Sequence, residues 1–308
     1  METMSKPELS RPASKLSTQA FLTLLLIGFI MGANHVCARF AFNDGLSVMT
    51  AVWVRSSVTS LIILGLIVLQ RVPRSISSSH IKYLIIVGIL ITIQSTSLYA
   101  SVARMPVALA LLAFNTYPLF VALLARLIYK EVIEQKVLWL MPVILVGLGL
   151  ALDVFGVTTA AGALEQWRVI GLGVAFALTA SLSFSFALLL TQHRTSGLDG
   201  RIRSVITLGM VSLLTFAICM VQGGPVWPQH FSGWIGLLLL TILYGTGFTI
   251  MFTVLPRLGA VGNTSIMNVE PVCALVLAWL ILDQHVSISQ ILGALIVVTG
   301  AIILGLRK

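Results

Sequence analysis

Two charged residues lie inside apolar stretches of this sequence, and both could bind a charged partner. Glu270 lies in the motif Asn-Val-Glu-Pro, and Arg55 lies well inside the stretch 47–69. A carboxylate in hydrocarbon is costly, so Glu270 is expected to face the protein interior, where it binds a substrate amine, carries a coupling proton, forms a hydrogen bond between helices or pairs with an arginine. Arg55 has a permanent charge that could attract a carboxylate or a phosphate, and the alternative is an ion pair with Asp44 or Glu270.

Other polar residues in the apolar stretches are further candidates for binding. Asn34 and His35 lie in the first stretch, and a single histidine there is either hydrogen-bonded in the core or a proton relay. Arg39 lies one turn later, and its long side chain is expected to reach the membrane surface. Most such polar groups form hydrogen bonds between helices. The remaining candidates for substrate binding are Gln94, Tyr99, Asn115, Tyr117, Ser183, Tyr244 and Asn268.

Two prolines occupy the middle of apolar stretches. Pro118 and Pro271 each follow an asparagine by three residues, in Asn-Thr-Tyr-Pro and Asn-Val-Glu-Pro. A proline in mid-helix removes one backbone hydrogen bond and clashes with the carbonyl four residues earlier, so it bends the helix. The bend could be a matter of packing alone, or it could form a hinge or a cavity wall in a protein that rocks between two states.

The sequence lacks the known signatures of an enzyme. It contains no His-Glu-x-x-His metal pair, no Gly-x-Ser-x-Gly nucleophile turn and no nucleotide-binding P-loop. Its three cysteines lie in apolar stretches without the spacing of metal ligands. We therefore expect no catalytic residue, no metal site and no cofactor, and ATP-driven transport by this chain alone has no support.

Composition indicates what must position these residues. Of the 308 residues, 58% are hydrophobic and only 9% are charged, against about a quarter in soluble domains. The apolar stretches do not alternate with polar residues as the strands of a barrel do. The sequence therefore predicts an all-α polytopic membrane protein with ten transmembrane helices. Their expected ranges are 20–42, 47–69, 81–103, 106–128, 137–155, 169–190, 202–221, 233–255, 261–282 and 287–306.

The basic residues indicate the orientation. If the tail 1–19 is cytoplasmic, all but four of the 19 Lys and Arg residues fall in cytoplasmic segments. The positive-inside rule then places both termini in the cytoplasm, with the chain crossing the membrane several times. The net charge of +9 suits the headgroups of membrane lipid, and we expect no nucleic-acid partner.

The sequence also repeats itself. A displacement of 153 positions aligns Asn115 with Asn268 and Pro118 with Pro271. We therefore divide the chain into two halves of five helices each, 20–156 and 169–306. Because five is odd, the second half enters the membrane from the opposite side, which makes the halves inverted repeats. Such repeats are typical of secondary transporters, whose binding site lies at the midplane between them.

These motifs carry a family resemblance. Gly32-Ala33-Asn34, Arg55, Pro118 followed by Lys130-Glu131, and Glu270-Pro271 followed by Gly293 and Gly300 resemble the EamA domains of the drug/metabolite transporter superfamily, over almost the whole chain. The chain departs from the family at Asp283-Gln284, where an acidic residue usually takes the second position. The resemblance implies a bacterial ten-helix exporter of metabolites or amino acids, with a cavity enclosed mainly by helices one to four and six to nine.

Together these features predict a secondary transporter. It would move a small organic solute by alternating access, and an amphoteric solute such as an amino acid would suit both Arg55 and Glu270. Coupling to protons is an open alternative to facilitated transport, and the protein is expected to be a monomer or a homodimer. The rival hypothesis is a receptor or assembly subunit that has the transporter fold but carries no flux. Nucleosides, sugars and cationic drugs are less favoured solutes.

Overall fold

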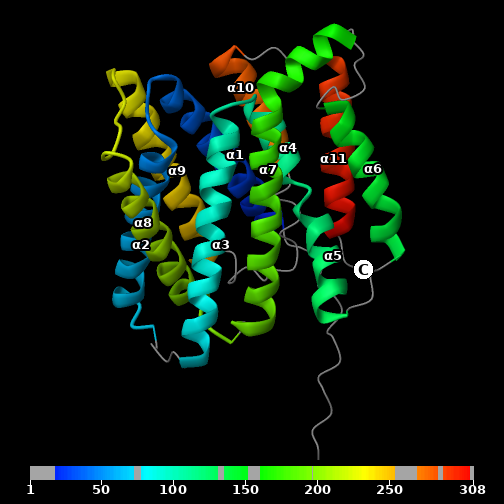
Figure 1. The fold of residues 1–308 in the computed structure, drawn as a ribbon. Coiled ribbons are helices and arrows are strands. Elements are labelled where there is room, and N and C mark those ends of the chain that lie inside the picture. The colour runs from blue at the N-terminus through cyan, green and yellow to red at the C-terminus, as the bar shows by residue number, and fades with distance from the viewer. Residues whose placement is uncertain are drawn as a thin grey trace, which may run out of the picture.

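The computed structural model describes residues 18–72, 78–130, 135–151, 160–195, 197–253, 269–283 and 287–305. These residues form helices joined by short connections, and they contain no strand. The helices, labelled in Figure 1, are α1 (Thr18–Asn43), α2 (Val48–Leu69), α3 (Ser78–Val102), α4 (Val107–Phe114), α5 (Tyr117–Tyr129), α6 (Gln135–Ala151), α7 (Ala160–Arg194), α8 (Gly200–Val221), α9 (Phe231–Thr253), α10 (Glu270–Leu282) and α11 (Ile288–Gly305).

Seven segments of the described chain are long and apolar enough to cross a bilayer. Six of them lie within α1, α2, α3, α7, α8 and α9, and the seventh, Val107–Tyr129, joins α4 to α5. Three shorter apolar segments lie within α6, α10 and α11. The prediction of an all-α, multi-pass membrane protein is thus confirmed. The number of ten spans stays a prediction, since part of the expected ninth span lies outside the described residues.

The helices pack mainly in pairs whose members are far apart along the chain. α3 lies against α7, α1 against α9, α2 against α8 and α6 against α11, with α10 against α1 and α4. In Figure 1, α6 and α11 form one edge of the bundle and α2, α8 and α9 the other. The pair α6–α11 is in backbone contact, because a Cβ atom on Gly293 would lie 2.4 Å from the nitrogen of Ala151. Glycine at this position therefore permits the close approach.

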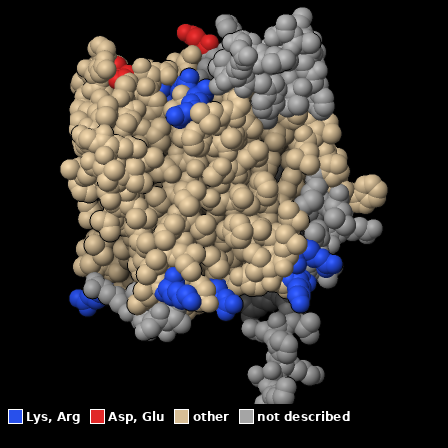
Figure 2. Space-filling model, viewed as in Figure 1, with Lys and Arg blue, Asp and Glu red and all other residues tan. Residues whose placement is uncertain are grey.

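The surface of the bundle suits a lipid environment. Large apolar side chains such as Leu61, Leu127 and Trp139 are more than half exposed. In the face shown in Figure 2, a broad uncharged band separates a rim of Lys and Arg at the bottom from the top, where acidic residues and some basic atoms lie. An apolar band with charges at its two edges is the pattern expected of a protein that crosses a membrane.

Candidate functional site

The first expected proline bend is a break between two helices. α4 ends at Phe114, residues Asn115 and Thr116 form a turn, and α5 begins at Tyr117 with Pro118 in its first turn. Proline costs no helical hydrogen bond at that position, because the first amide groups of a helix have no partner within it. The sequence predicted a bend within one helix at Pro118, whereas the structure has two helices meeting at a turn. The break leaves backbone groups available in the middle of the segment.

α10 begins in the same way. Glu270 is its first residue, Val269 its N-cap, and the buried Pro271 follows in the first turn. Asn268, predicted as a binding residue, lies outside the described residues. The first turn of a helix is the positive end of its dipole, so the carboxylate of Glu270 lies where a negative charge is stabilised.

Side chains of α7 hold the turn between α4 and α5. The hydroxyl groups of Thr116 and Ser181 are 3.0 Å apart, and Ser185 donates a hydrogen bond of 2.9 Å to the carbonyl of Tyr117. These three residues were not among the predicted site residues. The spacing of Ser181 and Ser185 by one helical turn is the sequence signal that could have indicated a polar stripe here. The polar stripe satisfies backbone that the break frees, as membrane-embedded backbone requires.

Arg55 on α2 is buried between two aromatic rings. Its side chain is in the interior, with the residue 3% exposed, and its guanidinium carbon lies 4.2 Å from the ring centre of Tyr99 and 4.0 Å from that of Tyr244. The buried Nε of Arg55 has no hydrogen-bond partner among the described residues. Stacking on two ring faces stabilises a desolvated cation by about 2 kcal/mol or more for a favourable contact.

Neither acid considered as a partner for Arg55 pairs with it in the described chain. Asp44 binds His230, and Glu270 binds His35. The alternative of an ion pair between Arg55 and Asp44 or Glu270 is therefore not realised in this structure. Within the described chain the Nε of Arg55 has no acceptor, and the planar fork of donors in a guanidinium is suited to a carboxylate.

A hydrogen-bonded network fixes the ring of Tyr99 beneath Arg55. The hydroxyl of Tyr99 donates to Oδ1 of Asn34 at 2.8 Å, and Nδ2 of Asn34 donates to the carbonyl of Leu240 at 2.6 Å. Both Asn34 and Tyr99 are fully buried. The network joins α3, α1 and α9, so the aromatic platform for Arg55 is held by three helices.

The second charged group, Glu270, meets α1 at His35. Nε2 of His35 lies 3.2 Å from Oε1 of Glu270. Gly32 makes this approach possible, since a Cβ atom at that position would lie 2.9 Å from the backbone oxygen of Glu270. The ring of His35 also meets that of Tyr99 edge to face, with centres 5.5 Å apart. A chain of contacts therefore connects Glu270, His35, Tyr99 and Arg55.

The other predicted site residues lie outside this chain of contacts. Asn115 and Ser183 are buried on α4–α5 and α7. Tyr117 packs with Phe114 and Phe184 in an aromatic cluster at the helix break. Gln94 on α3 is half-buried and accepts a hydrogen bond from Ser95. In this structure one set of candidates surrounds Arg55 and Glu270 and another lies at the break, and Tyr117 of the second set is near enough to Glu270 to interact with it electrostatically. Gln94 belongs to neither set.

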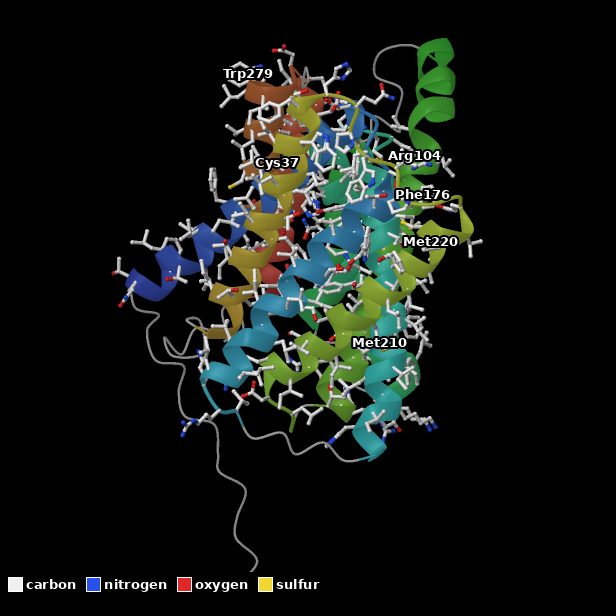
Figure 3. The ribbon with its side chains drawn as sticks, turned by 90° about the vertical axis from the view of Figure 1, so that its left-hand side faces the viewer. Cys37, Arg104, Phe176, Met210, Met220 and Trp279 are labelled. Carbon is white, nitrogen blue, oxygen red and sulfur yellow. The ribbon has the colours of Figure 1, made fainter. Side chains whose placement is uncertain are left out.

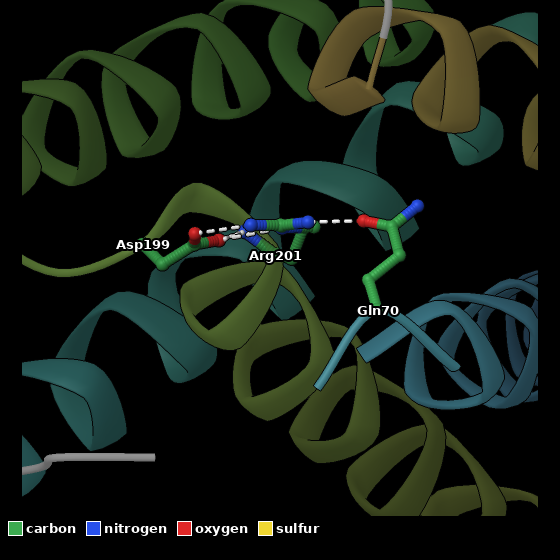
Figure 4. Close-up of polar contacts among 3 residues, drawn as sticks. All are labelled: Gln70, Asp199 and Arg201. Atoms are coloured by element: carbon green, nitrogen blue, oxygen red, sulfur yellow. Dashed lines mark hydrogen bonds and ion pairs between the residues drawn. The ribbon is translucent and has the colours of Figure 1, made fainter. Parts of the chain in front are cut away.

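Two further polar contacts join the connections at opposite ends of α2 and α8. At the end of α1, Oδ1 of Asp44 lies 2.6 Å from Nδ1 of His230, and the backbone amide of His230 donates to Oδ2 at 2.9 Å. That backbone hydrogen bond is the main reason why the pKa of Asp44 lies below its usual range. At the opposite end of α2, Arg201 bridges Asp199 and the side chain of Gln70 (Figure 4). Hydrogen bonds from Arg201 lower the pKa of Asp199.

A further arginine is held by packing at the end of α3. Arg104 donates to the carbonyl of Ala100 at 2.9 Å and stacks on Phe176 of α7, with 5.0 Å to the ring centre (Figure 3). Arg39 also donates to backbone, from Nη1 to the carbonyl of Val102 at 2.8 Å, while its buried Nε has no hydrogen-bond partner among the described residues. These contacts distinguish Arg104 and Arg39 from Arg55, whose contacts are ring faces. Among the described residues, no group of His, Cys, Asp and Glu side chains is arranged to hold a metal ion.

Comparison with known proteins agrees with this architecture. An uncharacterized transporter of Clostridium kluyveri is 24% identical over 237 residues, which cover 74% of this chain and 73% of that protein. One solved crystal structure superposes with a TM-score of 0.59 at 17% identity and covers 90% of this chain and 96% of its own, which shows a shared fold. Residues 18–152 and 171–306 each match the EamA-like transporter family. The chain therefore belongs to the EamA-like transporter family, of the drug/metabolite transporter superfamily, and contains two copies of its repeat.

Proposed function

We propose that this protein is a secondary transporter that moves a small organic solute across the bacterial inner membrane by alternating access. The observation that carries the proposal is Arg55, a buried cation that is held by two tyrosine rings and forms no ion pair among the described residues. A buried charge normally has a partner, because desolvation of an unpaired ion is costly. A solute carboxylate is the partner that fits the guanidinium.

The proposed solute is an amino acid or a related metabolite, moved outward. Its carboxylate would bind Arg55, and its amine would bind Glu270, which is 23% exposed along its side chain and is connected to Arg55 through His35 and Tyr99. An amphoteric molecule uses both charges, whereas a sugar or a nucleoside uses neither. Export follows from the resemblance to family members that export metabolites.

We also propose ten spans in two inverted repeats, with 20–156 and 169–306 as the repeat units. Two features support this arrangement. α5 and α10 both have proline as their second residue and both end on a left-handed residue, Lys130 and Asp283, at positions that the 153-residue displacement aligns. The packing is also symmetric between the repeats. In the proposed repeats α1 corresponds to α7 and α3 to α9, and α3 of the first repeat packs on α7 of the second just as α9 of the second packs on α1 of the first.

For orientation, we propose that both termini lie in the cytoplasm. The rim of Lys and Arg at the bottom of Figure 2 supports this, because basic residues favour the cytoplasmic side. In this orientation, the contact between Asp44 and His230 lies on the outer face and that between Asp199 and Arg201 on the inner face. The protein would work as a monomer or a homodimer.

Counterflow in proteoliposomes tests the proposed function. Vesicles preloaded with one unlabelled solute are given traces of the same solute in radiolabelled form, across the twenty L-amino acids, nucleosides and sugars. We expect accumulation for at least one amino acid, and no accumulation in vesicles without protein. Binding without counterflow for any solute would instead favour a receptor or assembly subunit. Counterflow confined to nucleosides or sugars would overturn the assignment of an amphoteric solute.

A further inference from the structure

The pair His35–Glu270 has features that solute binding alone does not explain. It joins α1 to α10, and therefore one family repeat to the other. His35 is almost fully buried, and its Nδ1 has no hydrogen-bond partner in the described chain. The carboxylate of Glu270 is the polar contact of this buried imidazole in the described chain, and a carboxylate stabilises a protonated imidazole. A ligand that takes the carboxylate would therefore remove the polar contact that the described chain gives to His35.

We propose that His35 carries the coupling proton and that a solute amine displaces it from Glu270. This inference rests on the proposed transport of an amphoteric solute. In the resting pair, protonated His35 donates from Nε2 to the Glu270 carboxylate. The ammonium group of the solute takes the place of the imidazolium at the carboxylate, and His35 then releases its Nε2 proton to water. One proton leaves for each solute that binds, and rebinding of a proton on the other side restores the pair and expels the solute.

The surroundings of the pair favour this exchange. Tyr99 contacts the ring of His35 edge to face, and the guanidinium of Arg55 lies over the same tyrosine ring, so both cations adjoin Tyr99. A solute ammonium would add another positive charge, and like charges disfavour protonation. Among the described residues, the other ionisable groups nearby are Tyr117 and Cys273, which are within electrostatic reach of Glu270, and Cys37 and Tyr244, which are within reach of Tyr99.

Proton exchange also accounts for the place of the pair at a helix junction. Glu270 is the first residue of α10, and its backbone touches α1 at Gly32. While His35 is protonated, the ion pair adds an attraction between these two helices, and once the solute has replaced it that attraction ends. The occupancy of Glu270 would thus bias the relative position of α1 and α10, which is what coupling of proton and solute requires.

The test measures protons released on solute binding. Purified protein in weakly buffered detergent, with a pH-sensitive dye, receives an equimolar mixture of the twenty L-amino acids at matched pH. We expect release of about one proton per protein, and an apparent affinity that rises up to tenfold per pH unit on the acidic side. In His35→Gln, which keeps a donor but cannot titrate, we expect little release and a flat pH dependence. The matched control is His230→Gln, which removes the histidine of the Asp44 pair and should keep both signals.

The outcomes separate this inference from the proposed function. Counterflow without proton release, or with equal pH dependence in wild type and His35→Gln, would overturn the role of His35 and leave the transporter intact. Absence of both counterflow and binding in the wild type would overturn the transporter itself. If His35→Gln does not fold, the protons released by the wild-type protein and by His230→Gln still test the proposed exchange. Absence of proton release by the wild type would contradict it.

Discussion

The guanidinium carbon of Arg55 on α2 lies 4.0 Å from the ring centre of Tyr244 on α9. The two residues belong to different family repeats, so the contact bridges the two halves of the chain. Tyr99 covers the other side at 4.2 Å. The rings stabilise the charge but offer no acceptor in the plane of the guanidinium, and a bound carboxylate would supply one.

The first prediction concerns this planar fork. In Arg55→Lys the charge remains, but the two parallel hydrogen bonds to a carboxylate and the stacking of the guanidinium are lost. We expect KM for a transported amino acid to rise roughly tenfold, which corresponds to about 1.4 kcal/mol. The matched control is Arg203→Lys, at a half-buried arginine in the first turn of α8. An equal rise in KM in both variants, measured by counterflow, would exclude a specific role for Arg55.

The second prediction concerns the support of the aromatic platform. Tyr99→Phe keeps the ring under Arg55 but leaves Oδ1 of the buried Asn34 without its donor. An unsatisfied buried acceptor costs about 1–3 kcal/mol, so we expect a lower Tm in detergent. Tyr244→Phe is the control, because it also keeps a ring on Arg55 and leaves the Asn34 network in place. Equal loss of Tm in both variants would contradict the importance of the Asn34 hydrogen bond.

The sequence predicted the positions of the helices better than the contacts that side chains make between helices. Composition and hydropathy predicted most of the helices within the described residues, because a bilayer span requires a continuous apolar run that is visible in the sequence. The exceptions are α7, which begins at Ala160 rather than at 169, and the expected helix 106–128, which is divided into α4 and α5. Arg55, His35 and Glu270 were each predicted as site residues, since a charged or titratable group within such a run is costly. Their residue types alone could not reveal that Glu270 meets His35 and that Arg55 meets two rings, because contacts between helices depend on rotation and crossing angle.

The break at Asn115–Thr116 shows the same limit on a local scale. Pro118 predicted a disturbance of the helix, and the structure has one there. Whether a proline bends a helix or starts a new one depends on partners for the freed backbone. Ser181 and Ser185 of α7 supply them, and no local pattern in residues 106–128 contains that information.

The third prediction tests the close approach of α1 and α10. In Gly32→Ala the added Cβ would lie 2.9 Å from the oxygen of Glu270 and 3.1 Å from the nitrogen of Ala274, so backbone must move. We expect a lower Tm and reduced counterflow, because the displacement lengthens the contact between Glu270 and His35. Gly65→Ala on α2 is the matched control, since a Cβ there meets nothing within 4 Å. Alanine at Gly65 should leave Tm unchanged or slightly raised, as its helix propensity exceeds that of glycine by about 0.5–1 kcal/mol. Equal behaviour of the two variants would show that the backbone contact at Gly32 is not needed.

The last prediction concerns pH and the contact of Asp44 with His230. The pKa of Asp44 is held below its usual range, mainly by the backbone amide of His230, and the unfolded chain has the ordinary value of about 3.9. A group whose pKa is lowered by folding stabilises the folded state above the unfolded pKa, and the contribution is lost as the pH falls through the folded value. We therefore expect Asp44→Asn to lower Tm at neutral pH and the difference from wild type to shrink below about pH 4. Asp283→Asn, at an exposed acid that ends α10, is the control and should follow the wild type at every pH. A difference between wild type and Asp44→Asn that stays constant down to pH 3 would mean that Asp44 acts through packing, because only the ionised carboxylate gains from the hydrogen bond of the His230 amide in this way.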